Sequence, residues 1–491
     1  MIEKNIKIWV VTNNVQNVNS TTKPVSYEQA AVWGFSKTAR LEYPQLWGGI
    51  IDVGSLTDAE IAKSVLQEIL VDEESEVCVT ENLNRYVERL TLFETKSGAG
   101  KKLSVRDNAT YVIAGGTGAL GVTVCDYLIS HGSRHIALLS RSRPADEMLD
   151  KLQLWKEKGI LVNTYQCDVT DKDSVEEAFA KIRSEMPIIK GMVAAMGTLD
   201  DKAISNMTWQ QFLKVFCVKA YGSVNLHNAI RNSLDFYVMF SSVASTFGNI
   251  GQSNYAAANY FLNIYSRYLR TLGVPAYSIC WGPWGEKGMA ARNTDNFKLM
   301  KSQGLSGLSH HDGAEIFGKI VAEEIPFIVA ADIDFLKYKD AAGSKDIANF
   351  LSDITGSADE SKSEQKTRDH SDILETLGKA TPENRQSILS AYLQNIVAKV
   401  MEFPAGRLPL TDKSLMEQGA DSLMMFSIRN EISKITGKEM NVSIMFNYPT
   451  ICELSGYLIS SQLSFSENCK PKAVSQKAED ILSQIDSLLK E

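Results

Sequence analysis

The chain has 491 residues and a net charge of −8, with 44% hydrophobic and 22% charged residues. This composition suits several packed domains and excludes a disordered polymer, and the negative charge disfavours nucleic-acid binding through a general positive field. No apolar run is long enough for a membrane span, and the N-terminus lacks a signal-peptide core, so we expect a cytoplasmic protein. Seven scattered cysteines without CxxC spacing predict neither a disulfide framework nor a metal site.

The predicted elements divide the chain into five parts. Residues 1–100 alternate strand and helix patterns, and residues 101–338 do so over the length of one doubly wound α/β domain of Rossmann type. Residues 339–369 are polar and predict a flexible linker. Residues 370–463 have helical apolar spacing and predict a small all-α four-helix domain. Residues 464–491 predict a polar spacer and a short amphipathic helix, which is either a docking element for a partner chain or second copy, or a frayed tail.

A glycine cluster follows the first strand of the second part. The strand covers 110–114, and a helical pattern begins within the cluster Gly116-Thr117-Gly118-Ala119-Leu120-Gly121. Glycines let a backbone approach a pyrophosphate at a helix N-terminus, so the cluster predicts a dinucleotide site, although a plain strand-to-helix turn has the same pattern. The next strand ends at Ser140 and Arg141, where arginine favours the 2′-phosphate of NADPH, unless the loop is only a solvated basic one.

The third strand of this part ends in a pair of candidate adenine contacts, Asp168 and Val169. An aspartate at this edge could bond the adenine amine, or it could cap the next helix. Asp171 is better placed for that cap, so we assign Asp168 to the base and Asp171 to the structural role.

Four polar residues further on form a candidate catalytic set. Strand 236–240 leads into Ser242, Tyr255 follows thirteen residues later, and Asn259 shares a helical face with Tyr255. A tyrosine has an unperturbed pKa of about 10, so it can protonate a carbonyl oxygen near neutral pH only beside a hydroxyl partner and a cation, which Ser242 and Lys219 can supply. The structural alternative is a core tyrosine, a helix-start serine and a surface lysine.

On these residues, region 110–338 resembles the ketoreductase domain of bacterial modular polyketide synthases, a branch of the short-chain dehydrogenases/reductases. In that branch the lysine lies upstream of the tyrosine, as Lys219 does, and an asparagine such as Asn259 takes the usual lysine position. The residues before 100 resemble the branch's structural subdomain with its opening part missing. We therefore expect either a chain excised from a larger synthase or a missing half supplied by a neighbouring polypeptide.

The resemblance implies a role for each of the four residues in reducing a carrier-bound β-ketoacyl thioester with NADPH. Tyr255 protonates the nascent alkoxide, and Ser242 holds and polarises the carbonyl. Lys219 lowers the tyrosine pKa and binds the nicotinamide ribose, and Asn259 orders the proton relay. Two other hypotheses stay open: a silent reductase fold that serves as carrier and docking scaffold, and a free-standing carbonyl reductase for untethered ketones.

The helical part carries a second motif, Gly419-Ala420-Asp421-Ser422-Leu423. It resembles the carrier-protein signature, in which the serine receives 4′-phosphopantetheine from a phosphopantetheinyl transferase; a simple helix N-cap would look similar locally. The resemblance implies that Ser422 is the attachment site, with other polyketide synthase domains or subunits as partners.

A third motif concerns stereochemistry. Leu199-Asp200-Asp201 resembles the triplet of B-type ketoreductases, which give the D-β-hydroxyl product. Phe247 stands where the opposite type carries a tryptophan, in agreement with this assignment. Alternatively, the two aspartates are only N-terminal charges for the next helix.

Overall fold

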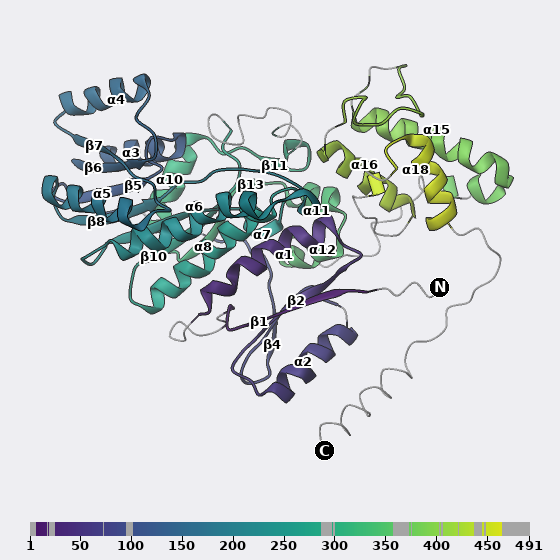
Figure 1. Cartoon of the computed structure of the whole chain (residues 1–491), viewed down its shortest axis with the longest axis horizontal. Helices are drawn as coiled ribbons and strands as arrows, with labels where there is room; N and C mark the ends of the chain where they lie inside the picture. The colour runs from purple at the N-terminus through teal and green to yellow at the C-terminus, as the bar shows by residue number, and fades with distance from the viewer. Residues whose placement is uncertain are drawn as a thin grey trace. The chain divides into compact units, whose positions relative to one another are not determined.

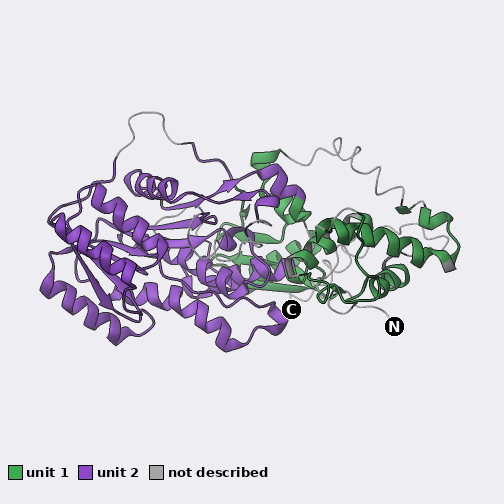
Figure 2. Cartoon of the chain, turned by 90° about the horizontal axis from the view of Figure 1, so that it is seen from above, with its two compact units in different colours: residues 1–11, 42–90, 341–491 green, residues 12–41, 91–340 purple. Residues whose placement is uncertain are grey.

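The computed structural model describes two compact units, coloured separately in Figure 2. Unit 1 comprises 1–11, 42–90 and 341–491, and unit 2 comprises 12–41 and 91–340. Within these ranges the described residues are 6–16, 18, 25–71, 73–94, 102–285, 297, 300–356, 373–374, 376–401, 403, 406–420, 422–436, 444–445 and 448–463.

A seven-stranded parallel sheet forms the centre of unit 2 (Figure 1), with the strand order β12-β10-β9-β8-β5-β6-β7. The strands are β5 (Thr110–Ala114), β6 (His135–Ser140), β7 (Leu161–Gln166), β8 (Ile189–Ala194), β9 (Phe236–Ser242), β10 (Ala276–Trp281) and β12 (Phe327–Ala330). The order reverses between β5 and β8. In open parallel sheets, ligands bind at such a reversal, beyond the carboxyl ends of the strands.

Helices cover both faces of this sheet. The first core lies under α3 (Ala119–Ser130), α4 (Asp146–Glu157) and α10 (His310–Ala322), and the second under α5 (Lys172–Glu185), α6 (Trp209–Asn228) and α8 (Ser253–Thr271). Side chains of β5 alternate between the two cores: Tyr111 and Ile113 enter the first, and Val112 and Ala114 the second. Because both faces are covered, the strands are almost continuously apolar. The predicted doubly wound α/β fold is confirmed.

Helix α1 (Ala30–Glu42) packs against α8 within unit 2. A Cβ atom on Gly34 would lie 2.3 Å from the carbonyl oxygen of Ala256, so the two helix backbones approach too closely for any side chain at this position. Trp33 stacks on Tyr260 beside this contact, with ring centroids 6.1 Å apart. The helix that carries the candidate residues Tyr255 and Asn259 is thus supported by a segment more than 200 residues earlier in the chain.

Unit 1 contains a four-stranded sheet of order β1-β2-β3-β4. The strands are β1 (Ile8–Asn13), β2 (Trp47–Val53), β3 (Glu76–Val79) and β4 (Arg85–Val87), and α2 (Asp58–Val71) packs on them. No glycine loop follows these strands in the described chain.

The segment predicted as a linker from residue 339 is partly helical. It contains the end of α11 (Phe335–Ala342), then α12 (Lys345–Phe350) and α13 (Ser352–Thr355). The difference arises because Ile347, Phe350 and Leu351 are buried, and Leu90 N donates to Phe350 O at 2.9 Å. Residues 357–369 of the predicted linker lie outside the described residues.

Residues 373–463 form a helical region with its own core, as the sequence predicted. Its main helices are α15 (Pro382–Val400), α16 (Ser422–Thr436), α18 (Ile451–Tyr457) and the π-helical turn Leu458–Gln462. Leu389, Leu393, Ile428 and Leu454 are among the buried residues that join them. The predicted amphipathic helix beyond residue 477 lies outside the described residues. In the described part of the chain, no helix has the length and apolarity that a membrane span needs.

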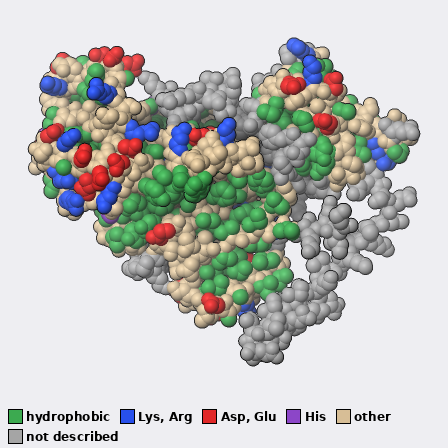
Figure 3. All heavy atoms as spheres, in the orientation of Figure 1, with side chains coloured by type: hydrophobic (Ala, Val, Ile, Leu, Met, Phe, Trp, Pro, Cys, Tyr) green, Lys and Arg blue, Asp and Glu red, His purple; other side chains and the backbone are tan. Residues whose placement is uncertain are grey.

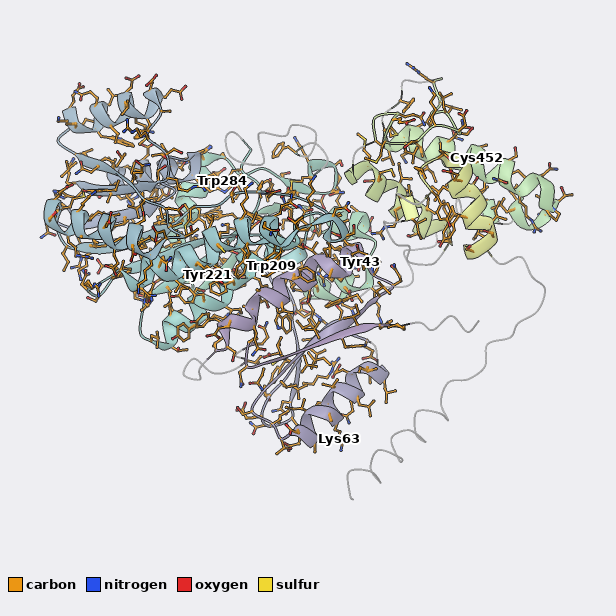
Figure 4. All side chains as sticks on the ribbon, viewed as in Figure 1. Tyr43, Lys63, Trp209, Tyr221, Trp284 and Cys452 are labelled. Atoms are coloured by element: carbon orange, nitrogen blue, oxygen red, sulfur yellow. The ribbon has the colours of Figure 1, made fainter. Side chains whose placement is uncertain are left out.

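The visible face of unit 2 has two kinds of surface (Figure 3). Charged side chains gather around α4 and α5, and hydrophobic side chains gather over α6 and α8. Trp209 and Tyr221, both labelled on α6 in Figure 4, are 65% and 52% exposed.

Candidate active site and carrier serine

The glycine cluster forms the turn from β5 into α3. Gly115 has φ of +78°, and its N–H donates to Leu139 O at 2.9 Å. A Cβ on Gly121 would lie 2.4 Å from the carbonyl oxygen of Gly115, so strand and helix pack as closely as glycine allows. Gly118 is the N-cap of α3 and provides no side-chain cap, which leaves the first helical amides open to an anionic ligand.

The predicted cofactor residues of the next two strands meet at the same edge of the sheet. Thr117 Oγ1 donates to Ser140 Oγ at 3.0 Å, and the exposed Arg141 follows. Partial desolvation acts to raise the pKa of Asp168, but hydrogen bonds from Thr170 and the charge of Arg141 outweigh it and lower that pKa. Arg141 and Asp168 therefore lie near each other.

Asp168 is held in a local turn. Of the residues after it, Val169 is buried and Asp171 caps the next helix. Asp168 Oδ1 accepts hydrogen bonds from Thr170 N and Oγ1, at 2.9 and 2.7 Å. Val169 is buried. Asp171 accepts from Asp173 N at 3.1 Å as the N-cap of α5, which confirms its predicted capping role.

The four candidate catalytic residues converge at the carboxyl end of β9. Ser242 ends that strand, Tyr255 lies in the first turn of α8, and Asn259 follows one turn later. Lys219 is on α6, 4% exposed; its Nζ donates to Phe240 O at 2.7 Å and lies 5.6 Å from the centroid of the Tyr255 ring. The structure thus brings together four residues from three elements.

Burial determines the protonation states of Tyr255 and Lys219. It raises the pKa of Tyr255, although contacts with Ser242 and Asn259 act to lower it. Burial also lowers the pKa of Lys219, to about 7. Tyr255 is therefore protonated near neutral pH and can act as a proton donor, and the charge of Lys219 is sensitive to pH in that range.

One side-chain atom of Asn259 lacks a hydrogen-bond partner among the described residues. Its Nδ2 donates to Tyr255 O at 2.8 Å, but its buried Oδ1 has no hydrogen bond to any described residue. A buried carbonyl oxygen without a partner is costly, so its position next to Tyr255 fits an acceptor for a water molecule or a ligand hydroxyl.

The Leu199-Asp200-Asp201 loop contacts both helices of the site. Asp200 accepts from Gln211 Nε2 at 3.0 Å and Lys214 Nζ at 2.8 Å, so it does lie against the beginning of α6. Asp201 accepts from Gln252 Nε2 at 2.8 Å, three residues before Tyr255. Sequence reasoning missed Gln252, although it lies within the segment that contains the tyrosine.

Phe247 lies in α7 (Ala244–Phe247) and is 2% exposed. Its ring packs against Tyr338, with centroids 4.8 Å apart. Tyr338 was not predicted from the sequence, because nothing in the sequence pattern links two residues so far apart. Phe247 is therefore a buried residue whose ring packs on Tyr338.

The candidate carrier serine, Ser422, is the first residue of α16. Gly419, three residues before Ser422, has φ of +100°. The Gln418 side chain accepts from Leu410 N at 2.7 Å and donates to Leu410 O at 2.9 Å, and these bonds hold the segment before the helix in place. Asp421 and the side chain of Ser422 lie outside the described residues. The predicted position at a helix start is observed.

Comparisons with known proteins agree with both parts of this arrangement. Residues 109–286 match the KR domain family, and residues 391–458 match the phosphopantetheine attachment site family. The chain is 26% identical over 480 residues to polyketide synthase GfsA of Streptomyces halstedii, in an alignment that covers 94% of this chain and 6% of that protein. It is 30% identical over 349 residues to the spectinabilin polyketide synthase system protein NorB of Streptomyces orinoci, covering 70% of this chain and 16% of that protein.

Solved structures give the same result for the fold. The first ketoreductase of the tylosin PKS is 26% identical with a TM-score of 0.61, and the alignment covers 72% of this chain and 75% of that one. PlmKR1, from phoslactomycin biosynthesis in Streptomyces sp. HK803, shares the fold at 24% identity and a TM-score of 0.65, covering 72% and 82%.

The fold and the two family matches define a ketoreductase domain followed by a phosphopantetheine attachment domain. The relatives of the chain are bacterial modular polyketide synthases, and it spans only a small part of their length. It covers 6% of GfsA and 25% of a phenolphthiocerol/phthiocerol polyketide synthase polypeptide of Mycobacterium tuberculosis.

Proposed function

We propose that the chain reduces a β-ketoacyl thioester, carried on phosphopantetheine at Ser422, to the D-β-hydroxyacyl thioester with NADPH. The observation that supports this most strongly is the convergence of Lys219, Ser242, Tyr255 and Asn259 at the carboxyl edge of the sheet. This edge also holds the glycine turn. Strand ends at the reversal of a doubly wound sheet are where a dinucleotide and its substrate meet.

The residues present fit a dinucleotide. The uncapped start of α3 and its close glycine packing suit a pyrophosphate, with Gly116, Thr117, Gly118, Leu120 and Gly121 as the loop that would hold it. Ser140 and Arg141 would take the 2′-phosphate, and Asp168 and Val169 would lie beside the adenine. When bound, NADPH supplies the hydride.

The proposed role of the protein in the reaction is proton transfer and orientation. Ser242 donates a hydrogen bond to the substrate carbonyl, and the Tyr255 hydroxyl gives its proton to the same oxygen as the carbonyl carbon is reduced. The resulting tyrosinate is stabilised by the charge of Lys219, and a water hydrogen-bonded to Asn259 Oδ1 would relay a proton from bulk solvent to it.

The carrier domain determines how substrate would arrive. An acyl chain attached through phosphopantetheine at Ser422 stays on the polypeptide that reduces it, which raises its effective concentration at the site. A phosphopantetheinyl transferase would install the arm, and other polyketide synthase domains or subunits would supply and remove the acyl group. This arrangement favours a tethered substrate over a free ketone.

The proposed D-configuration depends on the direction from which the pantetheine arm enters. The loop with Asp200 and Asp201 is tied to α6 and to Gln252, immediately before Tyr255, so it borders one side of the catalytic residues. A polar loop fixed there can guide the arm from that side.

NADPH oxidation with a diffusible β-ketoacyl thioester tests this function. We expect wild-type chain to consume NADPH and yield mainly D-β-hydroxy product by chiral chromatography, and Tyr255→Phe to lose about 10² to 10⁴ in rate while still binding NADPH. A mainly L product would refute the stereochemical assignment. No turnover by the wild-type chain would favour the silent-scaffold hypothesis.

A further inference from the structure

A chain of buried hydrogen bonds lies beneath the catalytic residues. Ser278 Oγ on β10 donates to Asn263 Oδ1 at 2.8 Å, and Asn263 Nδ2 on α8 donates to Ser245 Oγ at 3.0 Å. Ser245 Oγ on α7 then donates to the carbonyl oxygen of Ser242 at 2.6 Å. Asn263, Ser245 and Ser278 are each at most 3% exposed.

The hydroxyl protons fix which groups donate and which accept in this series of hydrogen bonds. A hydroxyl has a single proton, and that of Ser245 goes to Ser242 O, so Ser245 Oγ can only accept from Asn263. The proton of Ser278 goes to Asn263 Oδ1 in the same way. Asn263 and Ser245 therefore each accept and donate between different elements, and Asn263 is the member of the chain that lies on α8 with Tyr255.

A second bond links the same region to Asn259. Ser241 Oγ donates to the carbonyl oxygen of Asn259 at 3.0 Å and lies 3.3 Å from Ser245 Oγ. Cys280 Sγ also donates to Asn263 Oδ1, at 3.5 Å. The backbone carbonyls of two candidate catalytic residues are thus held by buried side chains.

Asn263 shares a helical face with the residues it would position. Tyr255, Asn259 and Asn263 are spaced by four residues along α8, so they form one row on its surface. The bonds of Asn263 to Ser245 and Ser278 therefore fix the rotation of this row against the end of β9, where Ser242 lies.

We propose that Asn263 is a positioning residue: it ties α8 to α7 and β10 and so holds the Tyr255 hydroxyl at its working distance from Ser242. This inference rests on the proposed reduction. A misplacement of about 1 Å caused by a residue away from the chemistry can cost about 10²-fold in rate. Substrate and cofactor binding depend on other groups, so they should change little.

Asn263→Leu tests the proposal, because leucine has a similar size and removes the side-chain bonds to Ser245 and Ser278 together with the weaker one from Cys280. We expect kcat to fall by about 10²-fold, with little change in the KM for a diffusible β-ketoacyl thioester or in the NADPH Kd. Ser278→Ala removes only the first bond and should reduce kcat in the same direction but less. It also keeps the proposal testable if Asn263→Leu does not fold.

Ser266→Ala is the matched control. Ser266 is 1% exposed and donates to Asn263 O at 2.8 Å within the helix, but it is not part of the chain to Ser242. We expect it to leave kcat unchanged. Wild-type kcat in Asn263→Leu, or equal losses of kcat in Ser278→Ala and Ser266→Ala, would overturn the inference. An inactive wild-type chain would instead refute the proposed function, since Asn263 would then have no reaction to support.

Discussion

At the scale of single residues, environment decides what each candidate group can do. Ser242, Tyr255, Asn259 and the upstream Lys219 could be predicted from spacing and residue type. Their protonation could not, because burial is a property of the fold: it raises the pKa of Tyr255 and lowers that of Lys219. The sequence also does not show that Asn259 Oδ1 is buried without a hydrogen-bond partner among the described residues.

The low pKa of Lys219 predicts a pH dependence. The Lys219 side chain is a charged ammonium below pH about 7 and a neutral amine above it. Because we assign this charge to stabilising the tyrosinate of Tyr255, kcat/KM should decline as pH rises through about 7. In Lys219→Arg the charge persists, since a guanidinium is not deprotonated in this range, so the decline should disappear even if the absolute rate is lower.

Initial rates between pH 5.5 and 9 measure this effect. Among the described residues, Lys219 from α6 lies 5.6 Å from the centre of the Tyr255 ring, and the charge of Asp201 from the loop after β8 acts to raise the pKa of Tyr255. An Asp201→Asn profile with the same decline as wild type would attribute it to Lys219. The same decline in Lys219→Arg would contradict the assignment.

Arg141 gives a second prediction at this scale. A charge-assisted contact with the 2′-phosphate contributes about 1.5 to 3 kcal/mol, so Arg141→Ala should weaken NADPH binding about tenfold or more and leave NADH binding nearly unchanged. Binding titrations with both cofactors measure this. Equal losses of affinity for NADPH and NADH would contradict the role of Arg141 and would make Arg143 the candidate for binding the 2′-phosphate.

At the scale of elements, periodicity predicted most strands and helices but not which distant segments meet. The strand of 110–114 and the glycine turn after it are encoded locally. The packing of α1 on α8 is not, since the sequence does not show that Gly34 faces Ala256. The region after residue 339 was predicted as linker because polar residues dominate it, and the burial of Ile347 and Phe350 depends on contacts that a local pattern does not contain.

The close contact between α1 and α8 predicts that adding one methyl group at Gly34 destabilises the fold. Gly34→Ala would place a Cβ 2.3 Å from the Ala256 backbone oxygen, so the helices must separate, at a cost of about 1 to 3 kcal/mol in the free energy of unfolding. Thermal unfolding should show a lower transition for the ketoreductase unit, with reduced kcat. Gly378→Ala is the control, because a Cβ there meets nothing within 4 Å. Equal transitions in the two variants would contradict the prediction.

At the scale of the whole molecule, two family matches on one chain support the proposal that the substrate is carried to its catalyst. The family matches cover the ketoreductase region and the helical region separately. Their order and the motif at Ser422 were readable in the sequence because each motif is local. The proposed delivery of an acyl group from Ser422 to Tyr255 is not encoded in either motif, because it would depend on the segment between them.

Intact-protein mass spectrometry of the chain tests the central claim most directly. A phosphopantetheinyl transferase and a β-ketoacyl coenzyme A load the wild-type chain, its Tyr255→Phe variant and its Ser422→Ala variant, and NADPH is then added. We predict that the wild-type acyl adduct gains the mass of two hydrogen atoms, that the Tyr255→Phe adduct stays unreduced, and that Ser422→Ala carries no adduct. A wild-type adduct that stays at the β-keto mass with NADPH present, or an adduct on Ser422→Ala, would contradict the account.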